Sequence, residues 1–232
     1  MKMAYRNVRK LLKLIDMKKL GIILFLFSFL PAIAQKTPFA DEISAFKKQD
    51  SLYPVKAKQI LFIGSSSFRM WTNVQQEFKD YPVINRGFGG STLPDLIYYA
   101  RDIIFPYDPK QIVIYCGDND LASSDTVTSM IVLKRFQTLF KTIRERLPQV
   151  SIVFVSIKPS PSRARLVEEM QNANALIKAF LAGQPNTGFV DVFDKMIRKG
   201  KIRKDLFRDD MLHMNAKGYA IWRKSIKPYL LK

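Results

Sequence analysis

The chain has 232 residues, of which 47% are hydrophobic and 25% charged, and its formal net charge at pH 7 is +18. The first two values are typical of an ordinary globular protein. The charge favours contact with anionic surfaces such as envelope polymers or phospholipid headgroups, and not with nucleic acid, because no basic run interleaved with aromatic residues is present. The single cysteine excludes an internal disulfide bond.

The N-terminal segment has the features of a signal peptide. A positive start at Met17-Lys18-Lys19 is followed by an apolar stretch from Leu20 to Leu30, and Ala32-Ile33-Ala34 fits a small-residue cleavage site. The apolar stretch is short for a membrane span, which needs about 20 residues, although an uncleaved anchor is an alternative. Translation from either Met1 or Met17 is compatible with this pattern. We expect cleavage after Ala34 and export to a periplasm-like compartment.

Removal of 34 residues would leave 232 − 34 = 198, a length that suits one domain. Residues 1–34 hold seven Lys/Arg and one Asp, so the remainder would keep a charge of 31 − 19 = +12. Residues 35–58 are polar and lack clear periodicity, and we expect a leader segment packed on the surface. The domain is predicted to span residues 59–232, without stable membrane insertion after the signal is removed.

Short apolar runs alternate with longer amphipathic segments through residues 59–232. The predicted strands are Gln59–Ile63, Val83–Asn85, Gln111–Cys116, Ser151–Ile157 and Phe189–Val192. The predicted helices are Phe68–Phe78, Leu93–Ile104, Thr126–Leu147 (capped by Ser124 or Asp125), Ala164–Leu181 and Ala216–Leu230 (capped by Asn215). Because the strands are apolar on both faces, the sequence predicts a five-stranded parallel sheet covered on both sides, a flavodoxin-like three-layer α/β/α fold.

Small-residue turns follow three of the predicted strands. Ser66 lies where a strand ends and a helix starts, a position that exposes a hydroxyl to helix N–H groups, although Ser65, Ser66 and Ser67 could each simply cap that helix. The pair Gly89-Gly90 would let the backbone approach a ligand closely, but two glycines could also simply form a tight turn. In Gly117-Asp118-Asn119-Asp120 the Asn119 side chain offers an amide donor, although the segment could equally be an ordinary Asn/Asp turn. The segment has too few oxygen ligands to enclose a metal ion.

The only histidine of the chain, His213, stands three residues after Asp210. At this spacing on a helical turn a carboxylate can reach Nδ1 and hold the ring so that Nε2 faces a nucleophile. A lone histidine is also often structural. A zinc site is disfavoured, because the chain has no second histidine and its only cysteine, Cys116, lies in an apolar run that indicates a buried side chain.

The four turns, in this order, resemble the SGNH hydrolases, also called the GDSL esterase/lipase family. Two of them, Asn85-Arg86-Gly87 and Gly117-Asp118-Asn119-Asp120, look closest to the platelet-activating-factor acetylhydrolase-like branch of that family. The resemblance covers about residues 59–229, and it differs from the usual pattern at Ser65, where the family has Asp before the nucleophile. The resemblance implies Ser66 as nucleophile, His213 as base and Asp210 as its partner. It also implies an oxyanion hole made of the N–H groups of Ser66 and Gly90 and the Asn119 side chain, with no cofactor or metal.

The implied function is hydrolysis of carboxylic esters with short acyl groups through an acyl-enzyme. The alternatives are a carbohydrate O-acetylesterase acting on envelope or dietary glycans, an acyltransferase, and a catalytically silent binding module. Lys158 and Arg163, in the basic loop after the fourth strand, could contact an anionic substrate, but we expect them to be solvated loop charges.

Overall fold

The computed structural model describes residues 37–232, and Phe39–Lys232 form one compact unit. The predicted signal peptide lies outside the described residues. Five strands form one parallel sheet in the order β2-β1-β3-β4-β5, which confirms the predicted fold class. The strands are β1 (Ile60–Gly64), β2 (Val83–Gly87), β3 (Gln111–Tyr115), β4 (Ser151–Val155) and β5 (Thr187–Val190).

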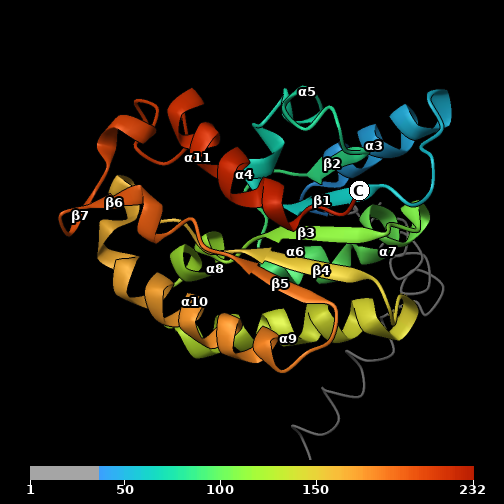
Figure 1. The fold of residues 1–232 in the computed structure, drawn as a ribbon. Coiled ribbons are helices and arrows are strands. Elements are labelled where there is room, and N and C mark those ends of the chain that lie inside the picture. Colours follow the sequence, from blue (N-terminus) through green and yellow to red (C-terminus); the bar gives the residue numbers. More distant parts are fainter. Residues whose placement is uncertain (1–36) are drawn as a thin grey trace, which may run out of the picture. The chain divides into compact units, whose positions relative to one another are not determined.

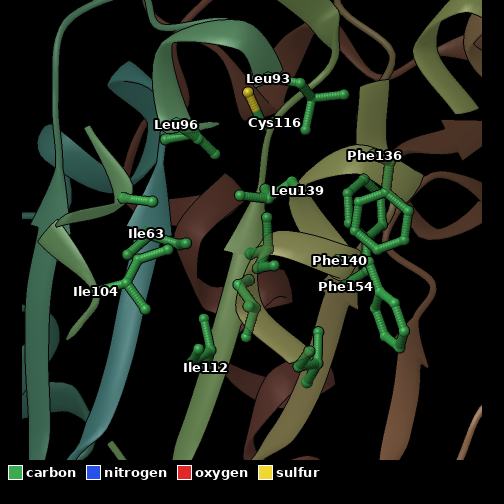
Figure 2. Packing of buried hydrophobic residues seen from close by; sticks show 14 of the residues in the cluster. Ile63, Leu93, Leu96, Ile104, Ile112, Cys116, Phe136, Leu139, Phe140 and Phe154 are labelled. Atoms are coloured by element: carbon green, nitrogen blue, oxygen red, sulfur yellow. The ribbon is translucent and has the colours of Figure 1, made fainter. Parts of the chain in front are cut away.

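Helices cover both faces of this sheet, as the apolar strands predicted (Figure 1). One face packs on α6 (Leu93–Tyr98), α7 (Ala100–Ile103), α9 (Ser129–Arg146) and α10 (Val167–Ala182). The other packs on α4 (Ser66–Arg69), α5 (Val74–Glu77) and α11 (Ala216–Ile226). Figure 2 shows the first layer, where Phe136 and Phe140 of α9 lie against Phe154 of β4. Alternate residues of each strand enter the two cores, because side chains along a strand point to opposite faces.

Several predicted helices are shorter or interrupted. The predicted Phe68–Phe78 helix is two short helices, α4 and α5, and the predicted Leu93–Ile104 helix divides into α6 and α7. The long helix begins at Ser129 after Thr128, not after the predicted Ser124 or Asp125. Asn215 caps α11 as predicted, since its side chain accepts hydrogen bonds from the N–H groups of Lys217 and Gly218. Short 3-10 turns and a two-stranded hairpin, β6 (Ile197–Arg198) and β7 (Lys201–Ile202), complete the unit.

The segment before the first strand contains a helix that the sequence did not predict, α3 (Ala40–Leu52). Ile43 is its one buried residue and joins the α9 side of the core. Phe46 packs partly buried against the same core, and the other side-chain contacts of α3 are polar. Its Asp50 forms a closed network with Arg86 of β2 and Tyr107, in which the tyrosine hydroxyl donates to Asp50 Oδ2 at 2.6 Å. A helix with so small an apolar face gives little periodic signal, which is why its pattern resembled a loop.

The only cysteine is buried, as predicted. Burial raises the pKa of the Cys116 thiol well above its usual value, and its Sγ lies 3.4 Å from the carbonyl oxygen of Ser91. This side chain therefore packs as a small apolar group. Among residues 37–232 no helix is long and apolar enough to cross a membrane.

Candidate active site

The nucleophile candidate stands at a sharp turn between β1 and α4. Gly64 makes this turn at φ +144°, and a Cβ at this position would lie 1.8 Å from the carbonyl oxygen of Tyr115, so only glycine fits. Ser66 is the first residue of α4, and its N–H therefore has no acceptor within the helix. Asn85 of β2 anchors the helix by donating from Nδ2 to the carbonyl oxygen of Phe68 at 2.7 Å.

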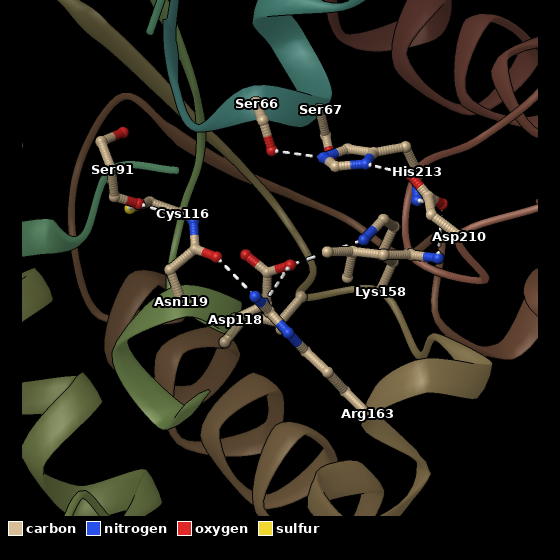
Figure 3. Close-up of polar contacts among 12 residues, drawn as sticks. Ser66, Ser67, Ser91, Cys116, Asp118, Asn119, Lys158, Arg163, Asp210 and His213 are labelled. Carbon is tan, nitrogen blue, oxygen red and sulfur yellow. Dashed lines mark hydrogen bonds and ion pairs between the residues drawn. The ribbon is translucent and has the colours of Figure 1, made fainter. Parts of the chain in front are cut away.

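Ser66 and His213 are 147 positions apart in the chain but form a direct hydrogen bond. Ser66 Oγ lies 2.9 Å from His213 Nε2, and His213 Nδ1 lies 2.6 Å from Asp210 Oδ2 (Figure 3). The structure thus brings all three residues into one hydrogen-bonded row. Because Nδ1 faces a carboxylate, it is the ring nitrogen that carries the proton, and Nε2 is left to accept from the Ser66 hydroxyl.

The loop that carries the histidine is a closed turn and not the helical turn that the spacing suggested. Met211 adopts φ +53°, and Asp210 Oδ1 accepts the backbone N–H groups of Leu212 and His213, each at 2.9 Å. The N–H of Arg208 donates to the carbonyl oxygen of His213 at 2.8 Å, which closes the base of the loop. This local hydrogen bonding fixes both the carboxylate and the imidazole.

The ionisation of Asp210 follows from these contacts. Burial alone would raise the pKa of its carboxyl group, but the hydrogen bonds from the His213 ring and from the backbone N–H groups of the loop lower it to about 2. The side chain of Asp210 is 46% exposed and that of His213 is 20% exposed. An ionised aspartate can therefore orient and stabilise a protonated imidazole at neutral pH.

Gly90 and Asn119 follow the ends of β2 and β3, the two neighbours of β1. A Cβ placed on Gly90 would lie 3.7 Å from Asn119 Nδ2, so the backbone of Gly90 approaches the side-chain amide of Asn119. Asn119 Nδ2 donates one hydrogen to the carbonyl oxygen of Ser91 at 3.0 Å and has a second hydrogen available. The Gly90 loop is held from outside by Glu42 of α3, whose Oε2 accepts the Gly89 N–H at 3.1 Å.

A group of charged residues beside Asn119 was not predicted as part of the site. Lys158 is only 1% exposed, with Nζ 3.4 Å from Asp118 Oδ2, and Arg163 Nη1 lies 3.0 Å from the same oxygen. The prediction of solvated loop charges was therefore wrong for Lys158 and Arg163. Both groups are directed at Asp118, a carboxylate within this chain. Burial would raise the pKa of Asp118, but the two cations outweigh that effect and lower it below its usual value.

The second carboxylate of the Asn119 turn has a structural partner. Asp120 is buried, with Oδ1 2.8 Å from Arg135 Nη1 and Oδ2 accepting the Leu93 N–H at 3.0 Å. It therefore joins the start of α6 to α8 (Asp118–Ser123) and α9. Ser65, at the position where the family resemblance leads us to expect Asp, is buried, and its hydroxyl has no hydrogen-bond partner among residues 37–232.

Comparison with known proteins shows the family to which this chain belongs. The model of the GDSL-like Lipase/Acylhydrolase family matches residues 62–221. The chain belongs to that family. It is 25% identical over 185 residues to the platelet-activating factor acetylhydrolase IB subunit alpha1 of Pongo abelii, covering 76% of this chain and 77% of the relative. As a member of the family the protein is an ester hydrolase.

Solved structures show the same fold. A GDSL-like lipase from Bacteroides thetaiotaomicron superposes with a TM-score of 0.69 at 20% identity, covering 81% of this chain and 96% of that structure. A carbohydrate esterase family 3 protein from Talaromyces cellulolyticus superposes with a TM-score of 0.61 at 15% identity, covering 74% of this chain and 95% of that structure. At these identities the likeness concerns the fold.

Proposed function

We propose that the protein is a serine esterase that cleaves short-chain carboxylic esters, with Ser66 as nucleophile, His213 as general base and Asp210 as the residue that orients the base. The observation that carries this proposal is the row of contacts from Ser66 Oγ through both ring nitrogens of His213 to Asp210 Oδ2, at 2.9 and 2.6 Å. A hydroxyl is activated as a nucleophile when a base accepts its proton and a third group holds that base in place.

The reaction has two halves. In the first, His213 Nε2 takes the hydroxyl proton while Ser66 Oγ attacks the ester carbonyl, and the protonated ring then gives the proton to the leaving alcohol. In the second, His213 takes a proton from water as the water oxygen attacks the acyl-enzyme, and the protonated ring then returns that proton to Ser66 Oγ as the bond from Oγ to the acyl carbon breaks and the acid is released. The ionised carboxylate of Asp210 stabilises the imidazolium that forms in each half.

The negative charge on the substrate oxygen needs donors, and three candidate donors follow the ends of the neighbouring strands β1, β2 and β3. The N–H of Ser66 stands at the first position of α4, Gly90 follows β2, and the second amide hydrogen of Asn119 is available beside it. Such preorganised donors contribute a large part of the catalysis in acyl transfer. We assign the oxyanion hole to these three groups.

Two features support a short acyl group and an exported enzyme. The curated relatives are named acetylhydrolases, after the removal of a two-carbon acyl group. The sequence of residues 1–34 has the charged start, apolar stretch and small-residue cleavage site of a signal peptide. N-terminal sequencing of the protein recovered from its native host would test the second point, with Gln35 as the expected first residue.

A fluorophosphonate probe tests the assignment of the nucleophile. We expect rapid labelling of the wild type at Ser66, no labelling of Ser66→Ala, and loss of p-nitrophenyl acetate hydrolysis in Ser66→Ala and His213→Ala. A panel of acetyl, butyryl and longer esters beside acetylated sugars then defines the substrate. Full turnover by Ser66→Ala would refute the mechanism, and a wild type that neither reacts with the probe nor hydrolyses any ester would indicate a binding module.

A further inference from the structure

Three charged side chains form a cluster directly beside the amide of Asn119 (Figure 3). Asp118 is at its centre, because Lys158 Nζ and Arg163 Nη1 both contact its Oδ2. Arg163 has a second contact, from Nη2 to the side-chain oxygen of Asn119 at 2.8 Å. The guanidinium group thus joins a buried carboxylate to a proposed oxyanion donor.

Stability alone is a poor explanation of this cluster. Lys158 and Asp118 are 1% and 3% exposed, and ions removed from water lose solvation that their mutual attraction often only balances. Burial lowers the pKa of the Lys158 ammonium, and Asp118 opposes that change. Apolar side chains of similar volume would fill the space at no greater cost. The position of the cluster beside Asn119 suggests a functional reason.

Two contacts, one to Ser91 and one from Arg163, favour the same orientation of the Asn119 amide. In the observed orientation Nδ2 donates to the carbonyl oxygen of Ser91 and Oδ1 accepts from Arg163 Nη2. Rotation of the amide by 180° would place its NH₂ group against the guanidinium and its oxygen against the Ser91 carbonyl. Both contacts would then be repulsive, and the site would present a carbonyl oxygen where a hydrogen-bond donor is needed.

We propose that Arg163 is a positioning residue for the esterase reaction: anchored on Asp118, it fixes the Asn119 amide so that its N–H faces the developing oxyanion. This inference rests on the proposed role of Asn119. Arginine is needed because Nη1 of its planar group forms the ion pair with Asp118 while Nη2 donates to the amide oxygen of Asn119, and a lysine ammonium lacks this fork. Lys158 balances the charge of Asp118 from the other side and so leaves Arg163 Nη2 free for the amide.

A double-mutant cycle between Arg163 and Asn119 tests this role. Arg163→Lys keeps a positive charge beside Asp118, and we expect it to lower kcat on p-nitrophenyl acetate by roughly 10- to 100-fold with KM changed by less than about threefold. Asn119→Ala should lower kcat by about 10²- to 10³-fold. In the Asn119→Ala background, adding Arg163→Lys should lower kcat by less than about twofold, because the amide it positions is already gone.

Controls separate this role from a loss of folding. Arg165→Lys changes an exposed arginine of the same loop, which pairs with Asp125, and should leave kcat unchanged. The melting temperature of every variant is recorded and activity is measured below all of them. The same cycle is run with Arg163→Gln, so the test does not depend on one substitution being tolerated.

Two results would overturn the role of Arg163. One is full turnover by both of its variants, and the other is an equal loss of kcat with and without the Asn119 side chain, which would mean that the arginine acts independently of the amide. Full turnover by Asn119→Ala alone is a different result, because it would refute the proposed oxyanion hole on which the inference rests.

Discussion

Asp210 holds His213 by two hydrogen bonds at once. Its Oδ2 is 2.6 Å from the ring Nδ1, and its Oδ1 accepts the backbone N–H of the same histidine at 2.9 Å. The carboxylate therefore fixes the backbone position of His213 as well as the orientation and tautomer of its ring. Few side chains could replace an aspartate that accepts hydrogen bonds with both oxygens.

Asp210→Asn should lower kcat by about 10³- to 10⁴-fold. The amide can still accept the backbone N–H with its oxygen, but its NH₂ group then faces Nδ1 and favours the tautomer with the proton on Nε2, which cannot accept the Ser66 proton. Steady-state hydrolysis of p-nitrophenyl acetate measures the loss, and circular dichroism checks that the fold is retained. A decrease of less than tenfold would show that the carboxylate is not needed to orient the base.

The low pKa of Asp210 also predicts a pH dependence of stability. Hydrogen bonds from His213 lower this pKa to about 2 in the folded protein, against about 4 in an unfolded chain. A lowered folded-state pKa means that the carboxylate stabilises the fold above pH 4 and that this contribution is lost as the pH falls from about 4 to about 2. Urea unfolding of the wild type and Asp210→Asn at several pH values should show a difference in the free energy of unfolding that shrinks over this range. A constant difference would contradict the assignment.

Gly90→Ala should lower the rate of ester hydrolysis without unfolding the protein. The new Cβ would lie 3.7 Å from Nδ2 and 4.0 Å from both Cγ and Oδ1 of Asn119, which is ordinary van der Waals contact. The fold should therefore be retained with a melting temperature within a few degrees of the wild type. The methyl group would cover the amide face that receives the substrate oxygen, so kcat should fall by roughly 10- to 100-fold. An unchanged kcat would mean that the oxyanion lies elsewhere.

The sequence predicted the sheet and the positions of its turns, because apolar strands and small-residue turns are local signals. Parallel strands place their carboxyl ends at one edge, so the element order placed Ser66, Gly90 and Asn119 at that edge. The loop of His213 follows no strand of the sheet, and its approach to Ser66 came from the family resemblance. No local pattern in the sequence indicates that Lys158 is buried. Its burial depends on Asp118, 40 positions away, and a lysine in a proline-rich loop has the same local sequence whether solvent or a carboxylate faces it.

Ser65→Ala should be tolerated. The hydroxyl of Ser65 is buried and has no hydrogen-bond partner within residues 37–232, so its removal breaks no hydrogen bond and relieves an unpaired polar group. We expect kcat within about threefold of the wild type and an unchanged or slightly higher melting temperature. Since the neighbouring Ser66→Ala should abolish fluorophosphonate labelling, the pair of variants also shows that the probe reports position 66. A large loss of activity in Ser65→Ala would indicate that this hydroxyl takes over the role of the usual aspartate.

Removal of the Asp50 carboxylate should destabilise the fold, because Asp50 links α3 to both Arg86 and Tyr107. Asp50→Ala would leave Arg86, a buried guanidinium, without its ion pair, and Tyr107, whose pKa is raised to about 12 by burial and by its bond to Asp50, without its acceptor. Asp50 is 23% exposed, so the loss should be somewhat below the roughly 3 kcal/mol typical of breaking a fully buried pair on one side. Lys47→Ala on the same helix is the matched control, since its pair with Asp102 is largely exposed and contributes less than about 1 kcal/mol. Urea unfolding measures both variants, and equal stabilities would show that α3 contributes little to the folded domain.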